Sequence, residues 1–257
     1  MEYHITRATT LDSTVGRSYL ATFGLVGASP WARAYPAYDP FRHTPSEACH
    51  AEKKGLGERM LDYLFDKILT AQGIEVFVEA FCELPMPHGW THIQNPAYHR
   101  HSYTYTDVGR VIALTPLVLR KFVNSDLFIK QAPLALIRKE FYLDIRNDMT
   151  CHEAITLIYL RFARCEFAVF DRTPNLDTIE WLTRECHHLY SHLTHCLFSE
   201  VEAAKRINIP KFHVSLHYRN TVLDYGSLPN TNSDAGERKH RSFKARAVRT
   251  NGRTIEK

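Results

Sequence analysis

The sequence contains no long hydrophobic run, although 44% of its 257 residues are hydrophobic. A helix that spans a membrane needs about 20 consecutive apolar residues, and no stretch approaches that length. The N-terminal stretch MEYHITRATT lacks the basic and then apolar pattern of a signal peptide. With 12% aromatic residues, the chain can bury a substantial core. We therefore expect a soluble, intracellular globular protein that does not interact with membranes.

Closely paired cysteines and glycine-rich loops are also missing. The six cysteines lie mostly inside apolar stretches, which is typical of reduced, buried thiols rather than of a disulfide framework or a Cys-x-x-Cys zinc site. The 11 glycines are scattered and form no phosphate-binding loop. We therefore expect no disulfides, and the scattered glycines argue against a nucleotide-binding enzyme.

Strand-like alternation is almost absent, apart from short candidates such as KFHVSLHY, residues 211–218. Helical periodicity dominates instead, because apolar residues recur every three or four positions. We predict a mainly α fold, a helical bundle whose last two long helices pack against each other. The predicted helices cover residues 55–72, 107–124, 153–170 and 178–206.

Candidate capping residues support three of these helices. A capping box pairs the N-cap side chain with an acidic side chain three positions later. Pro116 should bend its helix or divide it in two, because proline has no backbone N–H to donate. The candidate caps are Thr150 with Glu153, Asp177 with Glu180, and Asp107 as a single N-cap.

Residues 84–106 carry three prolines, a glycine and many His and Tyr side chains. We expect a long loop that lies against the helices through Trp90 and its tyrosines, rather than a domain linker. The sequence divides into an N-terminal segment (1–54), a helical domain (55–206) and a C-terminal basic segment (207–257).

Histidines and cysteines cluster in the predicted helix 178–206, where His188 and His192 are one turn apart and could share a zinc ion. A structural role is favoured, because these side chains flank the apolar stripe of an amphipathic helix and no completing ligand stands nearby. The histidines of the loop are irregularly spaced, and adjacent Cys–His pairs point in different directions, so they do not form dyads. The other residues concerned are Cys186, His187, His195 and Cys196 in the helix, His88, His92, His99 and His101 in the loop, and the pairs Cys49–His50 and Cys151–His152.

Positive charge is concentrated at one end of the sequence. Residues 237–257 contain eight Lys or Arg and two Glu, so the other 236 residues carry a net charge of −2 within the total of +4. Glu237 stands at the start of this segment, directly before the cations. A charge run is usually a solvated tail, but it also suits the phosphate backbone of DNA.

Two segments carry short motifs in a defined order. Residues 24–61 contain an aromatic–Asp step, an acid-x-x-His motif and a Glu-Lys helix start. Residues 207–253 contain an Ile-Pro-Lys-x-His start, a His-Tyr helix, a Tyr-Gly turn and a Glu-x-x-His step before a basic helix. The residues are Tyr38, Asp39, Glu47, His50, Glu52, Lys53, Lys54 and Gly55 in the first segment, and Pro210, Lys211, His213, His217, Tyr218, Tyr225, Gly226, Asn230, Gly236, Glu237, His240, Lys244, Arg249, Thr250 and Asn251 in the second. Both segments resemble CACTA-type cut-and-paste transposases, and the second is similar to the C-terminal portion of their fungal Plavaka branch.

The resemblance implies an RNase H-like core interrupted by a helical insertion, in which three carboxylates hold two Mg²⁺ ions that cleave a phosphodiester. Glu237 occupies the place of the last acid and Asp39 that of the second, while the first acid has no match. Glu47 stands where the family has Asp or Cys, and His240 completes the step that begins at Glu237. We therefore expect that Mg²⁺ is not bound productively and that the chain is inactive alone. Glu237 also fits a simple role as a cap of the basic helix.

Three hypotheses follow. In the first, the chain is a fragment of a fungal DNA transposase, which implies a nuclear protein in which Asp39, His50 and Glu237 lie close together. In the second, it is a non-catalytic DNA-binding module. In the third, it is a helical protein-interaction domain with a solvated tail. The partner in the first two is DNA, either transposon ends or non-specific duplex, and a homo-oligomer stays open. The expected phosphate contacts are Arg238, Lys239, Arg241, Lys244, Arg246, Arg249 and Arg253.

Overall fold

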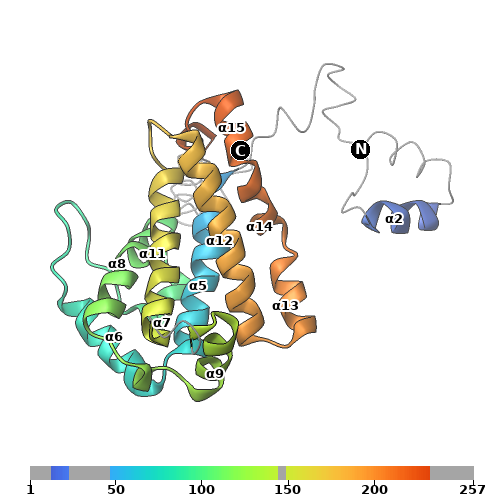
Figure 1. Cartoon of the computed structure of the whole chain (residues 1–257). Coiled ribbons are helices and arrows are strands. Elements are labelled where there is room, and N and C mark those ends of the chain that lie inside the picture. The colour runs from blue at the N-terminus through green and yellow to red at the C-terminus, as the bar shows by residue number, and fades with distance from the viewer. Residues whose placement is uncertain (1–12, 23–46, 144–148, 232–257) are drawn as a thin grey trace, which may run out of the picture. The chain divides into compact units, whose positions relative to one another are not determined.

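Figure 1 shows the computed structural model of the chain, which describes residues 13–22, 47–143 and 149–231. The chain forms two compact units, Met1–Pro45 and Ser46–Lys257. In the first unit the described element is the helix α2 (Ser13–Thr22). In the second unit the described residues form a helical bundle without β-strands. The mainly α-helical fold predicted from the sequence is confirmed.

Helix α11 lies in the middle of the bundle, with α8 on one side and α12 on the other. Apolar side chains occupy almost every face of α11, so the helix buries side chains against both neighbours. The predicted capping box of Thr150 and Glu153 is present at its start, and the predicted contact between α11 and α12 is confirmed. The bounds are α8 (Tyr105–Lys121), α11 (Cys151–Val169) and α12 (Leu176–Leu197).

The first helix of the bundle is built from three consecutive elements that follow one another without a break. Two of them have the wider turns of a π-helix, in which a backbone N–H donates to the carbonyl five residues earlier. Glu58 donates in this way to Lys53, and Leu69 donates to Leu64. Such wide turns are frequent at functional sites. The elements are η1 (Cys49–Gly57), α5 (Glu58–Asp62) and η2 (Tyr63–Ile68).

Shorter helices connect the long ones and cover their ends. Together the elements enclose one apolar core, and no helix among the described residues is long and apolar enough to cross a membrane. All six cysteines are free thiols, and five of them are buried, as expected. The bounds are α6 (Ala71–Glu83), α7 (Pro96–His99), η3 (Arg100–Ser102), η4 (Asp126–Phe128), α9 (Gln131–Glu140), α13 (Glu200–Ile207), α14 (Pro210–Val214), η5 (Ser215–His217), α15 (Tyr218–Tyr225) and η6 (Leu228–Thr231).

The start of α8 differs from the prediction for residues 107–124. Thr104, rather than Asp107, is the N-cap, because the Thr104 side chain accepts the backbone N–H of Asp107. The Asp107 carboxylate in turn accepts the backbone N–H of Thr104 at 3.0 Å, which completes a capping box. The helix then continues through Pro116 without division.

The predicted helix 178–206 is in fact two helices, α12 and α13. The backbone of Phe198 is extended, with φ −137° and ψ 158°, and this interrupts the helical path. At the other end Asn175, not Asp177, caps α12, since its side chain accepts the backbone N–H of Thr178 at 2.9 Å. The periodicity was continuous across both positions, so it did not reveal either boundary.

Two further sequence predictions need correction. The strand candidate 211–218 is helical, because Pro210 fixes the first position of α14 and the chain continues through η5 into α15. The predicted helix 55–72 ends earlier, at Ile68, because Thr70 is the N-cap of α6.

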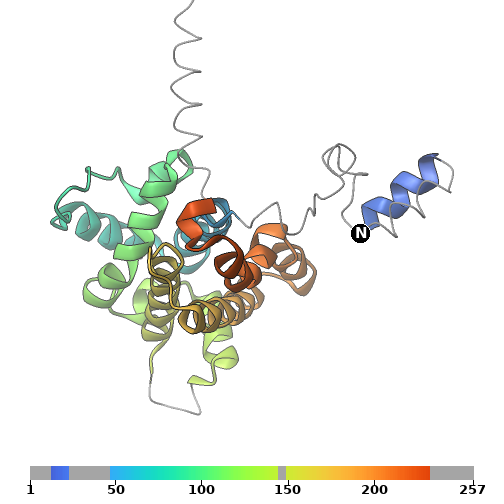
Figure 2. The same cartoon turned by 90° about the horizontal axis from the view of Figure 1, so that it is seen from above.

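The first and last helical segments of the bundle meet at one end. Gly55 of η1 approaches α14 so closely that a Cβ atom added there would lie 3.1 Å from Cβ and Cδ of Lys211. The Lys211 ammonium donates to the carbonyl oxygen of Lys54 at 3.3 Å. Figure 2 looks down on this end, where the blue start of the bundle lies beside the red α15. Segments far apart in the sequence are therefore neighbours here.

Candidate functional site

Most of the residues predicted to act in catalysis, in the Glu-x-x-His step or in DNA binding lie outside the described residues. Their predicted roles stay predictions, as does the convergence of Asp39, His50 and Glu237. The Mg²⁺ ligands implied by the resemblance, Asp39 and Glu237, belong to this group, so the fit of that ion is not tested by the geometry. The other residues outside the described ranges are Arg238, Lys239, His240, Arg241, Lys244, Arg246, Arg249 and Arg253.

Glu47 and His50 are described, and they form a hydrogen-bonded chain with a third residue. The Glu47 carboxylate accepts the backbone N–H of His50 at 2.6 Å and lies 2.5 Å from Nδ1 of the same imidazole. On the other side of the ring, the hydroxyl of Tyr105 lies 2.5 Å from Nε2. Because a carboxylate only accepts, Nδ1 carries the proton and Nε2 accepts from the Tyr105 hydroxyl. The acid-x-x-His motif thus holds its imidazole in a fixed orientation at the start of η1.

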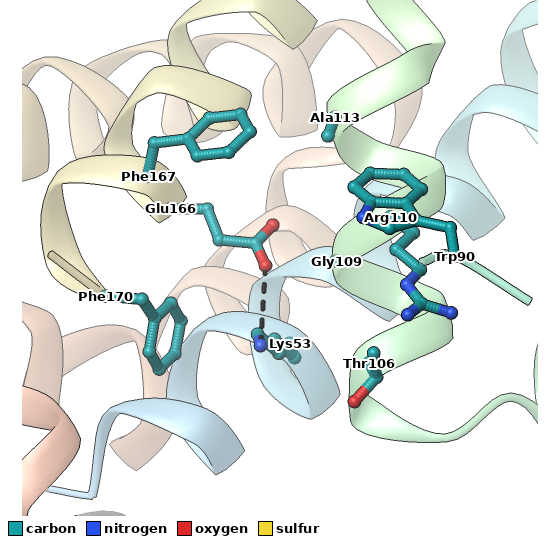
Figure 3. Close-up of a pocket in the computed structure, with 9 residues that line it drawn as sticks. All are labelled: Lys53, Trp90, Thr106, Gly109, Arg110, Ala113, Glu166, Phe167 and Phe170. Atoms are coloured by element: carbon teal, nitrogen blue, oxygen red, sulfur yellow. Dashed lines mark ion pairs between the residues drawn. The ribbon is translucent and has the colours of Figure 1, made fainter. Parts of the chain in front are cut away.

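Lys53, one turn after His50, points into a cavity of about 320 Å³ between α8 and α11. Its ammonium lies 3.7 Å from the Glu166 carboxylate and 4.2 Å from the centre of the Phe170 ring. Figure 3 shows the ion pair at the base of the cavity. The pair joins the first helix of the bundle to α11. The cavity is lined by Lys53, Trp90, Thr106, Gly109, Arg110, Ala113, Glu166, Phe167 and Phe170.

Gly109 makes room for the Glu166 carboxylate. A Cβ atom at position 109 would lie 2.1 Å from Glu166 Oε1, a distance that no pair of non-bonded atoms can adopt. Glycine is unfavourable inside a helix, so its presence in α8 is explained by this close approach. Burial raises the pKa of Glu166 to about 7, and the neighbouring Lys53 ammonium opposes the shift. The carboxyl group is therefore a much weaker acid than an exposed glutamate.

Trp90 is held over the mouth of the cavity by Arg110. The guanidinium carbon of Arg110 lies 5.1 Å from the centre of the indole ring, and one guanidinium nitrogen donates to the Thr91 hydroxyl at 2.9 Å. These contacts hold the irregular segment that follows α6 against α8. The predicted role of Trp90 as an anchor of this segment is confirmed. Phe167, which is 65% exposed, forms the opposite wall (Figure 3).

A second buried carboxylate lies behind the cavity, between η1 and α15. Glu52 is 6% exposed, and neither its Oε1 atom nor the hydroxyl of Tyr218 has a partner of normal hydrogen-bond geometry among the described residues. Burial raises the pKa of Glu52 to about 7, the Tyr218 hydroxyl opposes the shift, and the Glu166 carboxylate adds to it. Glu52 is thus a buried acid that is only partly compensated by Tyr218, at the contact between η1 and α15.

The histidines of α12 have structural partners. His187 stacks on Phe212 with 3.6 Å between ring centres, and its Nε2 lies 2.6 Å from the Ser215 hydroxyl. Burial lowers the pKa of His187 to about 4, so the ring is neutral at pH 7. His192 pairs with Glu140 at 2.7 Å. No group of three or more His, Cys, Asp or Glu side chains in the described part of the chain is arranged to hold a metal ion.

The sequence analysis did not identify the residues that complete the cavity. Glu166 had a signal, because it is an acid within the otherwise apolar stretch CEFAVF, and Gly109 had one as a glycine inside a predicted helix. Arg110 and Phe167 had none, because the other walls of the cavity come from distant parts of the sequence. Tyr105, which contacts His50 outside the cavity, had none either.

Comparisons of this chain with protein-family models, with curated proteins and with solved structures found no match.

Proposed function

We propose that this chain is a Plavaka-like portion of a fungal CACTA-type transposase that acts in the nucleus as a DNA-binding protein and does not cut DNA by itself. The observation that carries this proposal is the contact between η1 and α14. Lys54 and Lys211 are 157 positions apart in the sequence and still hydrogen-bond. They belong to the two segments whose motifs resemble the transposase family.

A helical insertion needs this arrangement. In the enzymes that the two segments resemble, the insertion separates the second acid from the last acid, so its first and last helices must return to one end. In this chain η1 follows the Glu47-x-x-His50 motif, and η6 ends at Thr231, shortly before Glu237. The contact between η1 and α14 supports an insertion whose first and last helices return to one end.

The charge distribution favours DNA as the partner. Residues 237–257 carry a net charge of +6 while the rest of the chain is slightly acidic. Lysines and arginines that neutralise phosphates release counterions, and this release supplies most of the free energy of non-specific binding. Binding without cleavage is proposed because the first acid of the family has no match in the sequence.

Binding to a fluorescein-labelled duplex, measured by anisotropy at several salt concentrations, tests the proposal. Release of about four counterions should give a slope near −3.6 for log K against log salt, with a dissociation constant on the order of 10⁻⁴ to 10⁻⁶ M at physiological salt. A variant with Arg241, Lys244 and Arg246 changed to Gln should lose about 2.7 of that slope if each contacts one phosphate.

A matched control changes three exposed arginines of the bundle, Arg120, Arg164 and Arg172, to Gln. This control removes the same charge from the whole molecule, so it should keep most of the slope. Equal binding by wild type and both variants, or no binding by any of them, would leave the basic segment as a solvated tail and would favour the helical interaction domain.

A further inference from the structure

The cavity between α8 and α11 combines three kinds of surface within a small space (Figure 3). Flat aromatic rings form opposite walls, with Trp90 on the α8 side and Phe167 on the α11 side. The Glu166 carboxyl lies between them and is paired with the Lys53 ammonium, while Arg110 lines the cavity beside Trp90. The volume of about 320 Å³ lies within the range of small-molecule sites in proteins.

The positions of the two cations exclude a positively charged ligand. An aromatic cage binds an ammonium group through the faces of its rings. Here the protein's own cations already occupy two of those faces, because the Lys53 ammonium lies 4.2 Å from the Phe170 centre and the Arg110 guanidinium carbon lies 5.1 Å from the Trp90 centre. A second cation would be repelled by both.

An aliphatic ligand also fits poorly, because it would displace water from the Glu166 carboxyl and offer no hydrogen bond in return, so the Lys53 ammonium at 3.7 Å would be left to compensate the charge. Burying a polar group with incomplete hydrogen bonding costs about 1–3 kcal/mol. A planar heterocycle with N–H donors satisfies both requirements, since its faces stack between aromatic rings and its edge donates to the carboxylate. If the heterocycle carries a phosphate, the two flanking cations complement that charge.

We propose that this cavity binds one unstacked nucleobase, with Trp90 and Phe167 stacking on its faces and the Glu166 carboxylate accepting from its edge. The proposal rests on the proposed function and specifies which part of DNA the cavity recognises. A carboxylate with two oxygens pairs best with two adjacent donors, and guanine presents N1–H and N2–H side by side. The expected preference is therefore for guanine. The base could come from an unpaired position in a DNA strand or from a free nucleotide.

The cavity is held in shape before any ligand arrives. Gly109 leaves room for the carboxyl of Glu166, which would have to move away from any larger side chain at that position. Arg110 fixes Trp90 through the ring contact and through the hydrogen bond to Thr91. Binding then costs little ordering of side chains, which favours affinity. The site needs no glycine-rich phosphate loop, because it recognises the base rather than cradling the phosphate.

The test measures binding of the full-length protein to four probes. These are single-stranded d(T)10, the same strand with one central dG, the matching duplex, and dGMP. Stacking on aromatic side chains and two-point pairing each contribute about 1–3 kcal/mol, so the dG strand should bind at least about fivefold tighter than d(T)10. Phe167→Ala should weaken binding of the dG strand at least about fivefold, and Glu166→Gln should remove the preference for dG.

Trp181→Ala is the matched control, because Trp181 is also exposed and lies 5.3 Å from the guanidinium carbon of an arginine, Arg161, at another place on the bundle. Its binding should equal that of wild type. Melting temperatures verify that each variant is folded. The proposal is overturned if folded Phe167→Ala and Trp181→Ala both bind like wild type, or if the dG strand and d(T)10 bind equally.

The probes also separate the sources of the base and the two proposals. If dGMP binds as tightly as the dG strand, the ligand is a free nucleotide, whereas binding of the strand alone identifies an unpaired base in DNA. If duplex binding depends on Arg241, Lys244 and Arg246 while the cavity variants change nothing, this inference fails and the proposed function stands. If instead the cavity variants weaken binding while the variant at Arg241, Lys244 and Arg246 binds duplex like wild type, duplex binding by the basic segment is rejected and the nucleobase site stands.

Discussion

At the scale of single residues, Glu52 has the environment with the clearest energetic consequence. Its carboxyl is buried in η1 beside Tyr218, without a partner for Oε1 among the described residues. Burial raises its pKa from 4.5 to about 7 in the folded protein. The contribution of the neutral carboxyl to the free energy of unfolding is fully present below pH 4.5, where the acid is neutral in the folded and unfolded states. This contribution is lost as the pH rises through 7, because the folded protein must then bury an ionised carboxylate. The native fold therefore carries a buried charge at alkaline pH.

Glu52→Gln should remove this pH dependence, because the amide has nearly the same shape and cannot ionise. A raised pKa of this size corresponds to about 3 kcal/mol of stability lost between pH 4.5 and pH 8. Urea unfolding at several pH values should show the variant gaining on wild type by that amount over this range. Glu166 is present in wild type and in the variant, so part of the change of unfolding free energy with pH is common to both proteins.

The exposed acid Glu83 provides the control, since Glu83→Gln should leave the pH profile of stability parallel to that of wild type. Stability profiles of Glu52→Gln and wild type that run parallel from pH 4.5 to pH 8 would contradict the buried-acid account.

At the scale of helices, the contact between η1 and α8 is set by Gly57. A Cβ atom at this position would lie 2.8 Å from Cγ1 of Val108, which is fully buried and β-branched. The carbonyl oxygen of Glu52 would lie 3.1 Å away on the same side. Since neither atom can move freely, the two helices would have to separate.

Gly57→Ala should therefore destabilise the bundle, although alanine is the better helix former by about 1 kcal/mol. Overpacking of a dense core costs about 1–3 kcal/mol, which exceeds that gain. Thermal unfolding followed by circular dichroism measures the effect. Gln72→Ala, at an exposed position of α6, should change the melting temperature little or raise it slightly. A variant Gly57→Ala with unchanged or higher stability would contradict this account, because it would mean that η1 and α8 can accommodate a Cβ atom beside Val108.

The helix predicted most closely is α11, which has both a strong period and a strong cap. Thr150 and Glu153 identified the start of α11 because the capping box is a local interaction between neighbours in the sequence. The break at Phe198 was missed because the apolar period continues through it. The helix α9 was not predicted, although Pro133 lies in its first turn, where proline costs no hydrogen bond.

The candidate site was predictable only in part, for a similar reason. The pairing of Glu47 with His50 joins two residues within one turn, and the sequence analysis named both as one motif without predicting their contact. The contacts of Lys53 with Glu166 and of His50 with Tyr105 depend on how η1, α8 and α11 pack together. A periodicity identifies which face of a helix is buried, but it does not identify the helix that covers that face.

At the scale of the whole molecule, we expect no metal-dependent DNA cleavage. Two-metal catalysis needs carboxylates that hold both ions, and the sequence offers candidates for only two of the family's three acids, Asp39 and Glu237. Incubation of supercoiled plasmid with the protein and Mg²⁺ or Mn²⁺ should leave the plasmid intact. Both ions should also change the melting temperature very little, because loosely held ions add little stability.

Nicking that requires Mg²⁺ or Mn²⁺ and disappears on Glu237→Gln would contradict this prediction. It would mean that a further acid completes the site, and Asp62 is one candidate in the described bundle. Asp62 also has a structural role, because it pairs with Arg100 at 2.8 Å. Loss of stability by Asp62→Asn without added metal therefore measures this structural role, separately from any role in holding a metal ion.

The meeting of η1 and α14 at one end has a consequence for how such a bundle can be inherited and moved. A domain whose incoming and outgoing chains lie side by side can be inserted into a surface loop of another protein without forcing the host to open. The same geometry favours circular permutation, since a short linker can join the two adjacent ends and new termini can be opened elsewhere. The bundle starts at η1 and returns to it at α14, so it has a layout that suits such transfer between host proteins.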